Sequence, residues 1–232
     1  MNNYNYKDVF NYKIFKNLEI TGIYNEPVIR PVNLTPTKVI SFNHCLSCKN
    51  PQDYFVHFYI DDYQFERIWN KPKLYADILK KFAGVIGPDF SAYTDLPLIQ
   101  QMYNLYRNKA ITAYYQKLGI NVIPNARWFD DKGIFEFNNG LNGLPKSSTI
   151  AITTHNCINS QGYAIFRIEF NDILEKLEPT RIICIGKMPQ EQFEICKKKN
   201  IEILIFQSEL EILENKGGEI NGKREKSKQF RL

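Results

Sequence analysis

Short apolar runs alternate with longer amphipathic segments along most of the chain. The runs are rich in β-branched and aromatic residues, which is typical of strands, and they lie at residues 27–32, 38–42, 55–60, 84–90, 121–128, 148–153, 181–185 and 201–206. The segments with apolar residues at helical spacing lie at residues 62–82, 95–118, 163–177 and 190–199. Pro72 is expected to begin a new helix or to kink the first, and Thr94 and Gly119 are placed to cap and to stop the second.

The regular alternation of strand and helix predicts an α/β fold with a mostly parallel sheet and right-handed crossovers. Eight candidate strands permit an irregular (β/α)-barrel, and a doubly wound open sheet with an N-terminal appendage is the alternative. We expect a single α/β domain over residues 1–214. Within it, residues 1–54 form an arm with a short helix at 6–17, irregular strands and a loop at 43–53, and residues 55–206 form the regular repeat region. A short helix is expected to end near residue 214, and residues 215–232 are expected to be a flexible basic tail.

Composition excludes wholesale disorder, because 44% of the 232 residues are apolar and 24% are charged. The formal charge of +5 is concentrated in residues 215–232, where six basic residues face two acidic ones. The rest of the chain is therefore nearly balanced, which argues against a basic groove across the fold. The tail is expected to be a solvated end, or a segment that contacts nucleic-acid phosphates.

Five irregularly spaced cysteines without a secretory signal are typical of reduced cytosolic thiols. No apolar run is long enough to span a bilayer, so we expect a cytoplasmic protein without a membrane partner.

Several segments that follow one another in order resemble a known family. They are HFYIDDYQFERIW, PDFSAYTDLP, YNLYRN, QKLGINVIP with Trp128, and GLPKSSTIAIT, between about Val56 and Gly186. On these motifs the chain resembles the domain of unknown function 4417 family of bacterial, phage and mobile-element proteins. The resemblance implies an origin in a phage or another mobile element, and it does not imply any particular activity.

Acidic residues end two of the predicted strands. Asp61, Asp62 and Asp89 follow apolar runs, and in a parallel sheet they would fall at the same carboxyl-terminal edge. Two carboxylates facing one polar pocket could hold Mg²⁺ or Mn²⁺, or could divide into an acid and a base. An aspartate in this position can also cap the next helix, an interpretation that fits Asp62 best. Asp61 and Asp89 therefore remain the catalytic candidates.

The long predicted helix adds polar residues to the same edge. Gln100, Asn104 and Arg107 share one stripe of the helix that follows Asp89, and they are expected to point towards it. A buried arginine normally needs an anionic partner. We expect this partner to be Asp89 in an internal ion pair, with a ligand phosphate or carboxylate as the alternative.

Three more residues lie at or just after predicted strand ends and are candidates for ligand binding. They are Ser91, Trp128 and Thr154. The turn at residues 153–155 and the Gly186-Lys187 turn could also contact an anionic ligand, although neither belongs to a phosphate-binding loop, and no nucleophile-elbow motif occurs.

A zinc site would have to combine distant residues. His44, Cys45 and Cys48 form one half and His155 and Cys157 the other, and nothing in their spacing brings the halves together. We therefore expect no zinc, and Mg²⁺ at Asp61 and Asp89 is the metal hypothesis.

Two classes of function remain. The first is an enzyme that acts on an anionic, nucleotide or nucleic-acid related substrate at the carboxyl-terminal strand edge, through Asp61, Asp89 and Arg107. The second is a binding or inhibitor protein that acts on a host protein or on nucleic acid through its loops and basic tail. The predicted fold does not decide between them.

Overall fold

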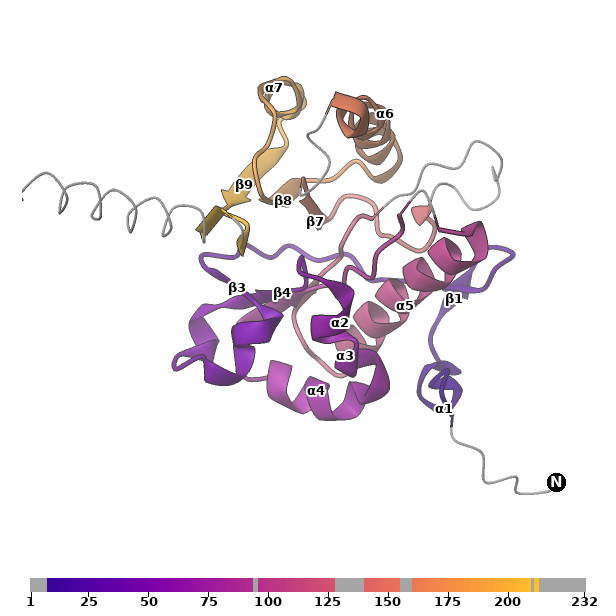
Figure 1. The fold of residues 1–232 in the computed structure, drawn as a ribbon. Helices are drawn as coiled ribbons and strands as arrows, with labels where there is room; N and C mark the ends of the chain where they lie inside the picture. The colour runs from indigo at the N-terminus through magenta and orange to yellow at the C-terminus, as the bar shows by residue number, and fades with distance from the viewer. Residues whose placement is uncertain (1–7, 94–95, 128–139, 155–159, 210, 213–232) are drawn as a thin grey trace, which may run out of the picture.

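The computed structural model describes residues 8–93, 96–127, 140–154, 160–209 and 211–212 (Figure 1). Its strands are β1 (Ile20–Thr21), β2 (Glu26–Pro27), β3 (Val39–Ser41), β4 (Phe55–His57), β5 (Gly84–Ile86), β6 (Val122–Ile123), β7 (Thr149–Thr153), β8 (Arg181–Ile185) and β9 (Glu202–Phe206). Its helices are α1 (Tyr12–Phe15), α2 (Asp62–Phe65), α3 (Arg67–Asn70), α4 (Pro72–Leu79), α5 (Leu98–Lys117), α6 (Ser160–Leu177) and α7 (Gln190–Lys198), with 3-10 helices at Phe42–Ser47 and Pro51–Asp53. None of these described helices combines the length and apolarity needed to cross a membrane.

Two parallel sheets carry the fold, and their strands follow one another in chain order. One sheet has the order β3-β4-β5-β6 and the other β7-β8-β9, while β1 and β2 form a separate antiparallel pair. A parallel bridge between Asn125 and Ala151 links the two sheets, and the Ala126 amide donates to the Ala151 carbonyl at 2.8 Å. The predicted α/β class with a mostly parallel sheet is confirmed. Among the described residues no strand pair joins β9 to β3, so closure into a barrel remains a prediction.

Side chains from the strands of both sheets meet in one apolar cluster, which we call the inner cluster. Its buried members are Phe55, Tyr59, Ile86, Ile123, Ala151, Ile183 and Ile185, with Val39, Leu204 and Phe206 packed against them. Because successive side chains of a strand point to opposite faces, the intervening residues face the helices. Strands covered on both faces explain why the runs read as continuously apolar rather than alternating.

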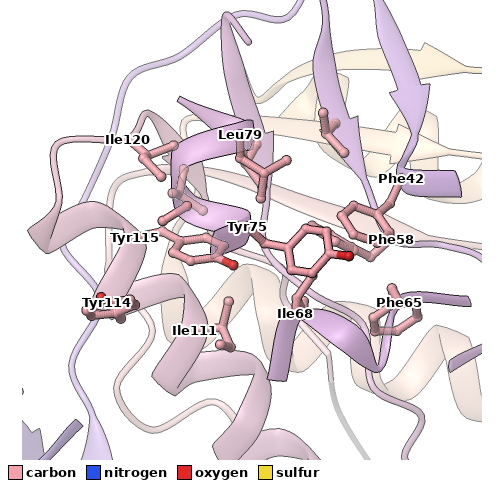
Figure 2. Close-up of a cluster of buried hydrophobic side chains, with 14 of the residues drawn as sticks. Phe42, Phe58, Phe65, Ile68, Tyr75, Leu79, Ile111, Tyr114, Tyr115 and Ile120 are labelled. Carbon is pink, nitrogen blue, oxygen red and sulfur yellow. The ribbon is translucent and has the colours of Figure 1, made fainter. Parts of the chain in front are cut away.

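The opposite strand faces pack under the helices in two further clusters. Val56, Val85 and Val122 join the aromatic residues of α2 to α5, part of which Figure 2 shows. Ile150, Ile152 and Ile182 pack with the apolar side of α6. Phe58 and Phe65 are fully buried in the first of these clusters, and each such ring contributes about 2 kcal/mol of hydrophobic stabilisation.

Several predicted elements are shorter than the apolar runs suggest. The runs at 84–90 and 121–128 form strands only at Gly84–Ile86 and Val122–Ile123, and a proline follows each strand closely, at positions 88 and 124. Proline lacks the amide hydrogen that a ladder needs, so each strand ends before its proline. Beyond Pro124 the chain bridges to β7 at Asn125.

The predicted helix at 62–82 is three short helices, and Pro72 begins the last of them as expected. The long helix starts at Leu98 rather than at 95, and Thr94 lies outside the described residues. Gly119 stops it in the left-handed conformation at φ +80.

The predicted strand at 27–32 is wrong beyond Pro27. The amides of Val28 and Ile29 donate to the carbonyls of Glu19 and Gly143, outside any parallel sheet. The predicted loop at 43–53 contains the two 3-10 helices. Residues 213–232, which include the predicted basic tail, lie outside the described residues.

Candidate functional site

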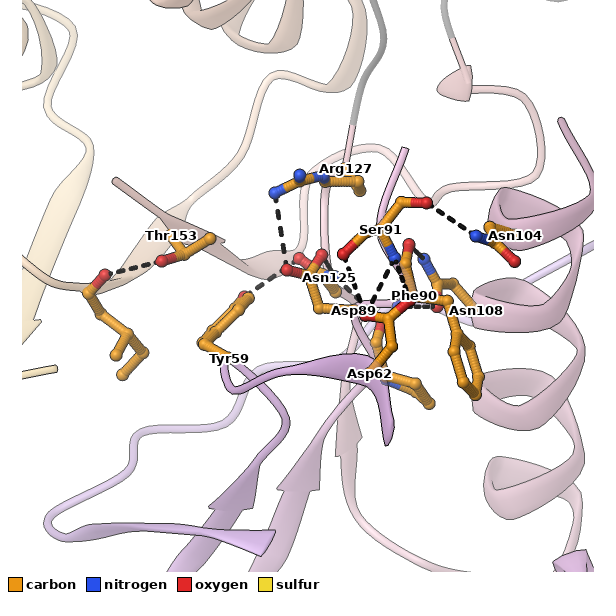
Figure 3. Close-up of polar contacts among 12 residues, drawn as sticks. Tyr59, Asp62, Asp89, Phe90, Ser91, Asn104, Asn108, Asn125, Arg127 and Thr153 are labelled. Atoms are coloured by element: carbon orange, nitrogen blue, oxygen red, sulfur yellow. Dashed lines mark hydrogen bonds and ion pairs between the residues drawn. The ribbon is translucent and has the colours of Figure 1, made fainter. Parts of the chain in front are cut away.

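The side chains that face the inner cluster change from apolar to polar towards the carboxyl ends of the strands. In and after β4 the order is Phe55 and then Tyr59, along and after β6 it is Ile123 and then Asn125, and in β7 it is Ala151 and then Thr153. Parallel strands end at the same edge of a sheet, so these polar groups lie close together there (Figure 3).

Asp89 is the charged centre of this edge. It is only 8% exposed, and its Oδ1 accepts a hydrogen bond from Asn125 Nδ2 at 2.9 Å. Its Oδ2 forms an ion pair with Arg127 Nη1 at 3.5 Å. The Tyr59 hydroxyl donates to Asn125 Oδ1 at 3.0 Å, so that a phenol, an amide, a carboxylate and a guanidinium form one network. We call Tyr59, Asp89, Asn125 and Arg127 the Asp89 network.

Electrostatics keep the phenol of the network protonated. Burial raises the pKa of Tyr59 well above its usual value, and the nearby charge of Asp89 raises it further. The hydroxyl is therefore a permanent donor at neutral pH, and it orients Asn125 so that the amide nitrogen faces Asp89. A carboxylate that can accept a proton and a guanidinium that can bind an anion thus lie side by side, an arrangement suited to acid–base chemistry on an anionic molecule.

Close packing at the end of β5 brings Asp89 to this place. A Cβ atom at Gly87 would come within 2.6 Å of Thr112 Oγ1 and 3.2 Å of the Asn125 backbone nitrogen. Only glycine allows this approach, so α5 and the end of β6 can pack directly against the chain two residues before Asp89.

Asp62 does not cap the helix that it begins, so the capping interpretation is wrong. It lies in the first turn of α2, and its carboxylate accepts hydrogen bonds from the Ser91 amide at 3.1 Å and from Ser91 Oγ at 2.9 Å. Burial raises the pKa of Asp62 against the hydrogen bonds from Ser91, which lower it, and the charge of Asp89 adds to the rise. The Asp62 carboxylate is therefore held by Ser91 and lies close enough to Asp89 for the two charges to repel.

The expected ion pair between Asp89 and Arg107 is also wrong. Arg107 is buried and does have an anionic partner, but this partner is Glu66, at 2.5 Å from Nη2. Its guanidinium also lies over the ring of Phe90, 3.6 Å from the centroid. Asn104 donates to the Ser91 carbonyl at 2.7 Å and accepts from Arg107 at 3.3 Å. These polar residues of α5 thus hold neighbouring chain segments.

The remaining sequence candidates fall in different surroundings. Asp61 and Gln100 are exposed, and the Asp61 carboxylate contacts Gln64 at 3.5 Å. Thr154 is only 2% exposed, and its hydroxyl has no hydrogen-bond partner in the described part of the chain. Trp128 lies outside the described residues.

A metal finds little support among the described residues. No group of three or more His, Cys, Asp or Glu side chains there could hold a metal ion, so Mg²⁺ at Asp61 and Asp89 stays a prediction. His44 pairs with Glu209 at 2.9 Å, and burial raises the pKa of Cys45, which favours the thiol over the thiolate that zinc binds. The second half of the considered zinc site, His155 and Cys157, lies outside the described residues.

Sequence reasoning missed Tyr59, Asn125, Arg127 and Asn108 as contributors to this edge. A signal was present for the first three, because a period of two along residues 55–60 and 121–128 continues the inner face of the strands to Tyr59, Asn125 and Arg127. Asn108 lies on a helix in which almost every nearby position is buried, so no pattern distinguishes it.

Comparisons with known proteins identify a family for this chain and two phage proteins to which it is similar. The model of the family described as "Domain of unknown function (DUF4417)" matches residues 18–207. The chain is 30% identical over 188 residues to the Gene 1 protein of Mycobacterium phage L5, which covers 78% of this chain and 78% of that protein. It is 27% identical over 175 residues to the Gene 1 protein of Mycobacterium phage D29, which covers 72% of this chain and 62% of that protein. No solved structure matches.

Proposed function

The chain belongs to the DUF4417 family, and from that premise we propose that it is a phage-type enzyme that acts on an anionic substrate at the Asp89 network. The substrate class that we propose is a nucleotide or a nucleic-acid end. The single observation that carries the proposal is the meeting of a carboxylate, a guanidinium and a phenol at the carboxyl ends of successive parallel strands.

In this proposal Arg127 binds the anionic group. Its side chain is 21% exposed, so a ligand can reach it, and a guanidinium recognises phosphate and carboxylate oxygens through paired hydrogen bonds. Thr154 is a candidate for a second contact, because a ligand oxygen would satisfy its buried hydroxyl. Trp128, one residue after Arg127, is the candidate for stacking on a base.

Asp89 favours an enzyme over a simple binding site. A carboxylate next to Arg127 repels an anionic ligand, so a site that only bound the ligand would bind better without it. A general base that takes a proton from water or from a substrate hydroxyl explains why the acid is there. Tyr59 and Asn125 would act by orienting this carboxylate rather than by touching the substrate.

The test is a binding and turnover screen with three variants. Binding of nucleoside mono-, di- and triphosphates and of short single-stranded oligonucleotides is measured by thermal shift and equilibrium dialysis. Turnover is followed by separating the reaction products by chromatography. We expect Arg127→Gln to weaken binding about tenfold or more, because a charge-assisted contact is lost. Asp89→Asn should bind at least as tightly as the unmodified protein and lose turnover.

Arg167→Gln is the matched control, because Arg167 also forms a carboxylate ion pair, with Glu191 at 2.6 Å, and belongs to α6 rather than to the Asp89 network. The proposal fails if no probe binds the unmodified protein, or if Arg167→Gln weakens binding as much as Arg127→Gln does. An Asp89→Asn protein that does not fold would make Asp89 a structural residue and would also contradict the proposal.

A binding protein that uses residues 215–232 is the second candidate, favoured by the six basic residues among these eighteen. A truncation after residue 214 separates the two functions. For the binding protein it weakens binding to oligonucleotides and flattens the salt dependence, whereas for the enzyme it leaves turnover of mononucleotides intact.

A further inference from the structure

The segment that carries Asp89, residues 88–91, is held almost entirely by side chains. It follows β5 without being part of a strand or helix, and within the described chain none of its backbone groups bonds to another backbone group. Buried backbone groups need partners, so other groups must supply them here.

Asn108 of α5 holds the middle of the segment. Its Oδ1 accepts from the Phe90 amide at 2.7 Å, and its Nδ2 donates to the Phe90 carbonyl at 3.1 Å. One side chain thus provides both hydrogen bonds that a neighbouring strand would otherwise provide.

Three more side chains hold the two ends. Asp62 accepts from the Ser91 amide, and Asn104 donates to the Ser91 carbonyl. Asn125 donates to the Pro88 carbonyl at 2.9 Å and, with the same nitrogen, to Asp89 Oδ1. The backbone of the segment is therefore held by side chains from α2, from α5 and from the end of β6, as Figure 3 shows.

Holding a loop with such a network of buried polar side chains has a high free-energy cost. Each buried amide or carboxylate must be fully satisfied, and a partly satisfied network is worse than an apolar contact. A few more residues of β5 ladder would fix the segment with backbone hydrogen bonds alone. Ladder pairing would, however, make the segment a continuation of the strand, whereas the side-chain contacts hold it outside the sheet.

We propose that Asn108, Asp62 and Asn104 are positioning residues that set the direction of the Asp89 carboxylate towards Asn125 and Arg127. This assigns Ser91 and Asn104 to the support of the site rather than to ligand contact. What Asp89 does for a substrate rests on the proposed function, but its positioning by these residues does not.

Asn108→Ala is the test variant, and Gln116→Ala is its matched control. Gln116 lies on the same helix and holds another backbone segment in the same manner, with Oε1 accepting from the Arg30 amide at 2.9 Å and Nε2 donating to the Arg30 carbonyl at 3.0 Å. Its Nε2 also donates to the Val122 carbonyl at 3.2 Å. Both variants lose a bidentate amide contact to the backbone, and only Asn108→Ala touches residues 88–91.

Two NMR measurements report the outcome on ¹⁵N-labelled full-length protein. In Asn108→Ala the Ser91 amide, which does not bond to Asn108, should exchange with solvent about tenfold faster or more, because the whole segment loosens. The side-chain amide resonances of Asn125, which contact Asp89, should shift. Gln116→Ala should leave both unchanged.

Unchanged Ser91 exchange and unchanged Asn125 resonances in Asn108→Ala would overturn the proposal, and so would equal changes in Gln116→Ala. If Asn108→Ala does not fold, Asn104→Ala is measured instead, which removes one bond to the segment and should change both readouts in the same direction. Neither readout needs a ligand, so a failure of the nucleotide screen and a failure of this proposal are distinguishable.

Discussion

His57 should make the protein less stable in mild acid. It lies at the end of β4, is only 3% exposed, stacks on Tyr59 and accepts the Tyr59 amide hydrogen on Nδ1 at 3.3 Å. Burial lowers the pKa of His57 from 6.5 to about 4, against the attraction of Glu209, which raises it. The folded state therefore keeps the ring neutral in a pH range where the unfolded chain protonates it.

The sign and the size follow from this difference. Between the two pKa values the unfolded chain binds the extra proton, so stability is complete above 6.5 and is lost as the pH falls towards about 4. The complete loss amounts to about 3 kcal/mol, of which about 2 kcal/mol falls between pH 7 and pH 5. Most carboxylates are still ionised in that window. The raised pKa of Asp62 acts in the opposite direction and is common to all variants compared.

Urea unfolding at pH 7 and pH 5 measures this loss. His57→Asn keeps an acceptor for the Tyr59 amide but cannot titrate, so its free energy of unfolding should change by less than about 0.5 kcal/mol over the window. His44→Asn is the control, since His44 is exposed and pairs with Glu209 at 2.9 Å. This variant should lose as much stability between pH 7 and pH 5 as the unmodified protein does. If His57→Asn loses as much stability between pH 7 and pH 5 as the unmodified protein does, the loss does not come from His57.

Two further predictions concern buried polar groups in the helical layer. Tyr115→Phe should be neutral or should stabilise the protein by up to about 1 kcal/mol in thermal unfolding, because the buried Tyr115 hydroxyl has no partner in the described chain. Tyr59→Phe removes a hydroxyl that donates a hydrogen bond and should destabilise the protein. A loss of stability in both variants would contradict this reasoning. Glu26→Gln should cost about 3 kcal/mol or more in urea unfolding, because it removes the charge of Glu26 from a buried ion pair with the Lys109 ammonium, 2.7 Å away. Glu178→Gln, which breaks the exposed ion pair with Lys146, should cost less than about 1 kcal/mol. Equal costs for Glu26→Gln and Glu178→Gln would show that burial of the pair does not matter.

The elements that sequence reasoning located well are those whose own residues determine them. β8 has the predicted bounds, Arg181–Ile185, because a run of β-branched residues buried on both faces has no other stable environment. Pro72 and Gly119 mark helix ends through backbone geometry that is local to them. The lengths of β5 and β6 were overestimated, since residues beyond a proline can remain buried without continuing the strand.

Sequence reasoning expected Asp89 and Arg107 near one edge of the sheet, but it did not find the partner of either side chain. Their charges suggested a pair. Glu66 lies one helical turn after Asp62, and no sequence pattern shows that it, rather than Asp89, reaches Arg107. Which of several carboxylates meets a given arginine depends on packing between helices, and this is a tertiary property.

The agreement between strand order and chain order has a consequence for synthesis on the ribosome. Each parallel strand pairs with one that has already been made, so β3 to β6 can assemble as the chain emerges. The Asp89 network draws its residues from the ends of β4, β5 and β6, and it is therefore complete in sequence before β7 exists. The inner cluster still lacks Ile183 and Leu204 at that moment, so a nascent chain would carry a finished polar edge above an uncovered apolar face.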